Sequence, residues 1–368
     1  MNPTPALTRL LSGDLPRSRV LTVVLLLILV ALAVAPFAFP GARALNMAAK
    51  VCIFVVLVAS YDLLLGYTGI VSFAHTMFFG IGGYGVAIAM SNLTPGWGAL
   101  LAGTAGALAV SAVLALVIGL FSLRVRAIFF AMITLAVATA FATLVSQLSD
   151  WTGGEDGLTF RVPEALRPGF VPFESVGWMD WFNGKLITYY LIFACALALF
   201  LLLLRIVNSP FGRVLQAIRE NDFRAEAIGY RTVVYRTAAS VLSALFATLA
   251  GVLMALWLRY NGPDTTLSFD IMVEILLIVV IGGMGTLYGT VIGTVLFLLA
   301  QTYLQDIMKL ASDAAAGAPV LSALLHPDRW LLWFGLLFVL SVYYFPQGVV
   351  GRLRGGRNGD GPRQRKTA

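Results

Sequence analysis

Three ionisable side chains lie inside otherwise apolar segments and are the first candidates for chemistry in this chain. They are Asp62, His75 and Glu274. A proton relay needs a chain of such groups, and a hydrolytic site needs a nucleophile, a base and an orienting partner close together. Cys52 and Cys195 have no metal-ligand spacing. We therefore expect no catalytic residue and no metal site, and we predict that the chain is not an enzyme.

A nucleotide-binding loop is also missing from the sequence. The pattern G-x-x-x-x-G-K-[ST] cradles phosphates on backbone amides. The only Gly-Lys pair, Gly184 and Lys185, is followed by Leu186, and Met179 occupies the position of the first glycine. We expect no cofactor on this chain. The energy for active transport would then come from a partner, such as a subunit that binds ATP, and the alternative is a passive protein.

Two glycine-rich segments carry the groups that could pass a small polar solute. Glycines let helices approach closely or break within a membrane, and a broken helix exposes backbone groups that can bind a zwitterion. The predicted translocation pathway comprises Ser72, His75, Thr76, Gly82, Gly83, Glu274, Gly282, Gly283 and Gly285. The alternative is structural: small-residue packing for the glycines, an interhelical hydrogen bond for the histidine, and a first-turn acid stabilised by the helix dipole for the glutamate.

The segment 208–236 predicts two short helices outside the membrane. Ser209 suits the N-cap of the first helix and Pro210 its first position, and apolar residues then recur at helical spacing as far as Ile218. Asp222 can cap a second helix that ends at Gly229, where glycine permits a left-handed stop. A helix pair of this size suits a groove on another protein. The alternative is an amphipathic loop that rests on the bilayer surface.

The elements that must position these groups are membrane helices. The chain is 59% hydrophobic and only 12% charged, and its mean hydropathy is +0.89. Continuously apolar runs of about 20 residues recur along it, which favours helices over a barrel. We predict an all-α polytopic bundle of about ten transmembrane helices with Gly-rich breaks. The expected spans are 20–40, 47–65, 70–90, 97–121, 127–148, 187–205, 237–258, 270–283, 287–304 and 329–346.

Basic residues orient the predicted bundle, because Lys and Arg concentrate in cytoplasmic loops. With both termini cytoplasmic, 17 of the 25 basic residues lie inside. The net charge of +7 therefore reflects topology, and no nucleic-acid partner is expected. The predicted organisation is a cytoplasmic segment 1–19, a permease domain 20–346 with a periplasmic loop 149–186 and a cytoplasmic loop 208–236, and a basic cytoplasmic tail 347–368.

Five stretches, in order, resemble the motifs of permeases in branched-chain amino acid ABC importers, specifically the LivM type. They are DLLLGYTGIVSFAHTMFFGIGGYG from Asp62, TGGEDGL from Thr152, SPFGRVLQAIRENDFRAEAIGY from Ser209, ILLIVVIGGMGTLYGTVIG from Ile275 and FPQGVVG from Phe345. The resemblance covers nearly the whole chain from the second span onward. One departure is Asp62, where the family pattern has Asn. We expect Asp62 to lie near the cytoplasmic end of its span and to reach water.

The resemblance implies a permease of the bacterial inner membrane that imports branched-chain or similar hydrophobic amino acids. The implied partners are a second homologous permease (LivH-like), two cytosolic ATPase subunits and a periplasmic substrate-binding protein. It also implies that the second short helix docks on an ATPase. The predicted coupling residues are Arg219, Glu220, Asp222, Phe223, Arg224, Glu226, Ala227 and Gly229.

Other functions stay open at this point. Closely similar permeases carry urea or a short amide. A self-powered secondary transporter or channel, and a membrane scaffold without a substrate path, are more distant alternatives.

Overall fold

The computed structural model describes residues 19–38, 41–122, 127–170, 183–314 and 326–329, and nine single positions between 332 and 350. The chain divides into two compact units. One is Ala31–Leu276, and the other combines Met1–Val30 with Leu277–Ala368.

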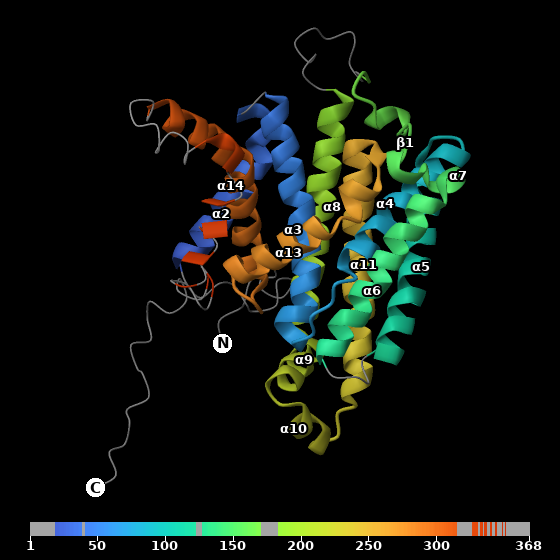
Figure 1. Cartoon of the computed structure of the whole chain (residues 1–368), viewed down its shortest axis with the longest axis vertical. Helices are drawn as coiled ribbons and strands as arrows, with labels where there is room; N and C mark the ends of the chain where they lie inside the picture. Colours follow the sequence, from blue (N-terminus) through green and yellow to red (C-terminus); the bar gives the residue numbers. More distant parts are fainter. Residues whose placement is uncertain are drawn as a thin grey trace, which may run out of the picture. The chain divides into compact units, whose positions relative to one another are not determined.

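The chain is almost entirely helical (Figure 1). In the first half the helices are α2 (Arg19–Ala38), α3 (Ala42–Thr68), α4 (His75–Asn92), α5 (Trp97–Ser122), α6 (Ala127–Gln147), α7 (Ser149–Thr152) and α8 (Gly184–Val207), with short 3-10 turns η1 (Gly154–Asp156) and η2 (Glu164–Leu166). The second half contains α9 (Pro210–Glu220), α10 (Asp222–Ala227), α11 (Thr232–Leu258), α12 (Pro263–Thr266), α13 (Phe269–Gly282), α14 (Leu287–Ala314) and η3 (Pro327–Arg329). Strands β1 (Leu158–Thr159) and β2 (Tyr260–Asn261) form a single antiparallel pair.

Eight segments within the described residues are long and apolar enough to cross a membrane. This confirms an all-α, multi-pass membrane protein. The predicted third span corresponds to α4, which is not one of the eight, and most of the tenth, 329–346, lies outside the described residues. Helices α5 and α6 turn many apolar side chains outward, such as Leu101, Val113 and Ile128. Lipid or another membrane subunit can cover such surfaces, whereas water would not tolerate them over whole helices.

The core of the Ala31–Leu276 unit forms around α3 and α11, which pack against each other, while α11 also packs on α4 and α5. Helices α4 and α11 touch through glycines. A Cβ atom at Gly82 would lie 1.9 Å from the carbonyl oxygen of Thr248, and one at Gly251 would lie 1.8 Å from that of Phe79. Only hydrogen fits at these two positions, so the two backbones are in direct contact.

Helix breaks occur at the ends of helices and not inside the first glycine-rich run. Helix α4 is continuous from His75 to Asn92, although the sequence suggested a break among its glycines. The chain is interrupted before it, where Gly69 adopts a left-handed conformation with φ 73° and ends α3. In the other unit, Gly283 and Gly285 have φ values of 110° and 80° between α13 and α14. Helix α13 has 14 residues, about 21 Å of rise, which is shorter than a bilayer core.

Candidate functional site

The segment 208–236 folds into the two predicted helices, and the first of them starts where the sequence predicts. Pro210 occupies the first position of α9, as predicted. Ser209 has the extended backbone of an N-cap, but its hydroxyl donates to the carbonyl of Ile206 at 2.6 Å and caps no amide of α9. Ser209 is therefore the N-cap residue of α9, as predicted, although its side chain does not cap the helix. The hydroxyl instead satisfies a carbonyl at the end of α8.

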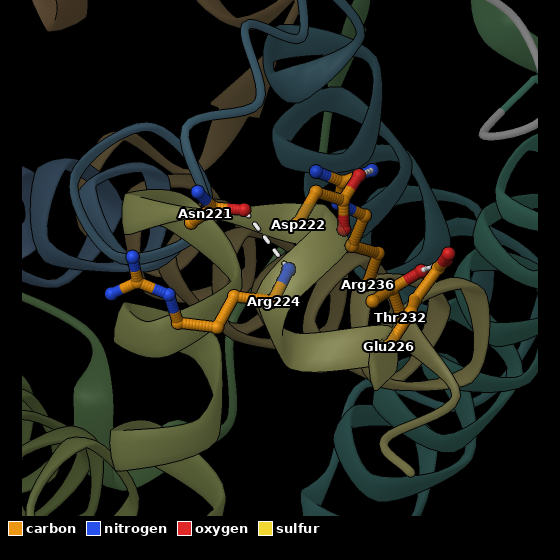
Figure 2. Close-up of polar contacts among 6 residues, drawn as sticks. All are labelled: Asn221, Asp222, Arg224, Glu226, Thr232 and Arg236. Atoms are coloured by element: carbon orange, nitrogen blue, oxygen red, sulfur yellow. Dashed lines mark hydrogen bonds and ion pairs between the residues drawn. The ribbon is translucent and has the colours of Figure 1, made fainter. Parts of the chain in front are cut away.

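Asn221, and not Asp222, caps α10. Its side-chain oxygen accepts a hydrogen bond from the amide of Arg224 at 2.9 Å, and Asp222 is the first residue of the helix (Figure 2). Asparagine is as good an N-cap as aspartate, so the adjacent pair left two possible starts one residue apart. At the other end, Gly229 has the left-handed conformation that the sequence predicts, with φ 96°.

Two side-chain contacts tie α10 to the start of α11. Arg236 forms an ion pair with Asp222 at 3.0 Å, and the Thr232 hydroxyl donates to Glu226 at 2.7 Å (Figure 2). Helix α9 is tied separately to α3, because the Arg219 guanidinium donates to the carbonyl of Gly66. Arg219 and Glu226 were predicted to face a partner, and they also serve these internal contacts. The partners Thr232 and Arg236 were missed because sequence spacing does not show how the chain turns after Gly229.

The outward face of α10 carries an unusually exposed aromatic side chain. Phe223 is 86% exposed, and Ile228 and Tyr230, which follow the end of α10, are also exposed. Glu220, Arg224 and Ala227 are exposed as well, whereas Ala225 is buried toward the protein. An apolar residue surrounded by polar ones on a short, anchored helix has the character of an interface anchor.

The predicted pathway residues at the start of α4 are buried, and His75 belongs to a hydrogen-bond network among three helices. Ser72, His75 and Thr76 are each at most 5% exposed. His75 Nε2 shares a hydrogen bond of 2.8 Å with the hydroxyl of Ser60 in α3. The Ser243 hydroxyl of α11 donates to the Ser60 carbonyl at 2.5 Å. These contacts favour the structural interpretation of His75, as a residue that joins helices.

The remaining pathway residues are distributed over both units. Gly82 contacts α11, and a Cβ at Gly83 would lie 2.1 Å from the side-chain oxygen of Asn261. Glu274 is partly buried in the second turn of α13. Gly282, Gly283 and Gly285 belong to the other unit, where a Cβ at Gly282 would lie 2.2 Å from the carbonyl oxygen of Gly289. Close packing accounts for Gly82 and Gly282, and a role of any of these residues in transport stays a prediction.

Asp62 differs from its predicted environment. It was expected to reach water near the end of its span, but it is fully buried in α3. The reason is that α3 continues to Thr68 and is covered there by α9 and α11. The sequence shows where the apolar run ends, but it does not show which other helices surround that end.

Comparison with known families gives the same picture from independent information. Residues 43–342 match the family described as the permease component of branched-chain amino acid transport systems. The chain belongs to this permease family. The matched region of the permease includes α3 through α14, and therefore both the α9–α10 pair and the buried His75 network.

Named relatives of the permease agree with this assignment and with the predicted LivM resemblance. The chain is 27% identical over 323 residues to a high-affinity branched-chain amino acid transport system permease protein, LivM, of Salmonella typhimurium, covering 83% of this chain and 74% of the relative. LivM of Escherichia coli is 26% identical over 83% of the chain and 74% of the relative, and a probable LivM of Methanocaldococcus jannaschii is 26% identical over 77% and 80%. No solved structure matches the permease significantly.

Proposed function

We propose that this permease is the membrane-spanning subunit of an ATP-driven importer of branched-chain or similar hydrophobic amino acids. The observation that carries the proposal is the anchored α10 helix with its exposed Phe223, in a chain of this permease family. The proposed partners are a LivH-like permease, two cytosolic ATPase subunits and a periplasmic substrate-binding protein. The proposed location is the bacterial inner membrane, with both termini and the α9–α10 pair in the cytoplasm.

The contacts of α10 supply a route by which movement of an ATPase could reach the membrane helices. A displacement of α10 acts on the start of α11 through the Asp222–Arg236 ion pair and the Glu226–Thr232 hydrogen bond. Helix α11 carries that displacement into the membrane as a rigid element. There it contacts α3 through Ser243 and α4 through Gly251. A single contact would allow α10 to rotate about it. The two contacts together oppose this rotation.

Uptake by the reconstituted complex tests the proposed function. Proteoliposomes containing the two permeases and the ATPase subunits, with the binding protein added outside, should accumulate labelled leucine, isoleucine or valine only when hydrolysable ATP is enclosed. An ionophore should leave the initial rate unchanged, because no ion gradient is used. Uptake that needs the gradient but not ATP would identify a secondary transporter. Accumulation of labelled urea or acetamide, without accumulation of leucine, would assign the amide substrate class instead.

A double-mutant cycle tests the proposed route through α11. We expect Asp222→Asn and Arg236→Gln each to reduce the amount of leucine imported per ATP, and the double variant to be no worse than either single one, because all three lose the same contact. The pair is partly exposed, so each change should cost only roughly 0.2–1 kcal/mol of stability, and the ATPase should still bind through Phe223. The control is Arg213→Gln, at an exposed position of α9. Fully additive losses of coupling would argue against the pair as the shared route.

A further inference from the structure

Two adjoining hollows lie where α3 and α8 begin and α11 ends, all within the Ala31–Leu276 unit. The larger has a volume of about 470 Å³ and the smaller about 320 Å³, and Pro168, Leu258 and Arg259 line both. The basic residues that line them are Arg161, Arg167, Arg259, Lys50 and Lys185. We call this site the basic hollow. No carboxylate lines it among the residues that the structure describes.

This gathering of positive charge is unexpected at this end of the bundle. On the predicted topology it is the periplasmic end, where the membrane-insertion process disfavours Lys and Arg. Only eight of the 25 basic residues of the chain fall on that side, and five of them line the basic hollow. Topology explains the basic residues on the cytoplasmic side, but it does not explain the gathering of these five, which points to a local role.

Arg259 gives a second, independent indication. It has φ 56°, the only positive φ at a non-glycine position in the described part of the chain. It ends α11, where its amide donates to the carbonyl of Ala255 at 2.7 Å. Glycine or asparagine would adopt this left-handed cap at lower cost. An arginine in a conformation unfavourable for its backbone points to use of its side chain, which lines both hollows.

The rest of the lining indicates what kind of anion fits. Apolar side chains, including Leu166, Met254 and Leu256, line the smaller hollow. Lys185 Nζ lies 5.7 Å from the centre of the Trp257 ring. Basic groups beside tryptophan at the ends of spanning helices occur where phospholipid headgroups lie. A hollow with an apolar wall also suits the start of an acyl chain better than it suits a fully hydrated ion.

From these observations we infer that the basic hollow binds the phosphate headgroup of an anionic phospholipid in the outer leaflet. The arginines at its rim pair with the phosphate, and the apolar wall contacts the glycerol and the first methylenes. The acidic surface of a binding protein is a less suitable occupant, because a hollow accepts a small group that projects into it and not a broad protein face. The inference concerns lipid binding and does not depend on the identity of the imported solute.

The test compares two variants with the same change in charge. The hollow variant combines Arg161→Gln, Arg167→Gln and Arg259→Asn, the last chosen because asparagine tolerates the left-handed backbone. The control combines Arg43→Gln, Lys309→Gln and Arg329→Gln, at basic positions on the same predicted side that do not line the hollow. Each protein is placed in nanodiscs of mixed phosphatidylcholine and phosphatidylglycerol, and the lipid retained after extraction is measured by native mass spectrometry.

Loss of three surface cations should weaken retention of phosphatidylglycerol about 100-fold in the hollow variant. Retention by the control should match the parent, and retention of phosphatidylcholine should be unchanged in all three proteins. Equal phosphatidylglycerol retention by hollow variant and parent would overturn the inference. Two added measurements then identify another occupant. Stabilisation of the parent, but not the variant, by inorganic phosphate in pure phosphatidylcholine would indicate a free-anion site. Selective loss of binding-protein affinity in the variant would indicate a protein contact.

Discussion

Replacement of Phe223 by alanine should weaken docking of the ATPase subunits at least about tenfold, because truncation of a central aromatic anchor commonly costs about 2 kcal/mol or more. The side chain is 86% exposed and sits on a helix held at both ends by capping and at its side by α11. Its removal should therefore leave the permease folded. The measurements are co-purification of the ATPase and leucine uptake in proteoliposomes.

Trp151→Ala supplies the matched control for this substitution. Trp151 is also a strongly exposed aromatic residue, and it lies in α7, at the opposite end of the same unit from α10 (Figure 1). We expect it to leave ATPase docking unchanged. If Phe223→Ala combined with Glu226→Ala binds the ATPase and drives uptake normally, α10 is not the coupling helix. Other cytoplasmic segments would then have to be tested.

Gly251→Ala should destabilise the fold more than any surface change considered above. The added methyl carbon would lie 1.8 Å from the carbonyl oxygen of Phe79 and 3.2 Å from the amide nitrogen of Gly83. Both atoms belong to the α4 backbone, so no side-chain rotation can relieve the overlap. Overpacking of this kind costs typically about 1–3 kcal/mol, and sometimes more. We expect a lower thermal unfolding temperature in detergent and loss of uptake.

Gly106→Ala in α5 is the control for Gly251→Ala, because a Cβ atom at Gly106 would meet nothing within 4 Å. Its unfolding temperature should stay the same or rise, since alanine has the higher helix propensity by about 1 kcal/mol. Equal unfolding temperatures for the two variants would show that α4 and α11 do not depend on backbone contact. Measurement in two detergents would exclude an effect of one micelle.

Sequence reasoning worked where the signal is local. Apolar runs in the sequence located nine of the helices, and most of the predicted helix ends lie within a few residues of the observed ones. Pro210 marked the start of α9, and Gly229 marked the stop after α10. Each of these inferences depends on residues that are neighbours in the chain. The composition of a segment also decides whether it can face lipid, so the amino-acid sequence was sufficient to predict a membrane protein.

The larger errors arose where distant segments meet, whereas the cap of α10 was misplaced by only one residue between two suitable neighbours. The burial of Asp62 depends on helices from elsewhere in the chain, and the hydrogen bond of Arg219 joins it to Gly66, 153 positions away. The basic hollow was missed for the same reason. Arg161 and Arg167 lie in the segment between α7 and α8, whereas Arg259 lies at the end of α11, and the sequence offered only a count of charges on one side. Register between helices is set by close packing, which a single sequence does not display.

The contact of Gly82 with α11 has a mechanical consequence. If α11 tilts about its crossing with α4 at Gly251, it acts as a lever with unequal arms. The arm from Thr232 to Gly251 is about 28 Å long, and the arm from Gly251 to Leu258 is about 10 Å. A shift of about 3 Å at the Thr232 end would thus move the Leu258 end about 1 Å in the opposite direction. A larger movement at the end tied to α10 would become a smaller, reversed and more forceful movement at the other end of α11.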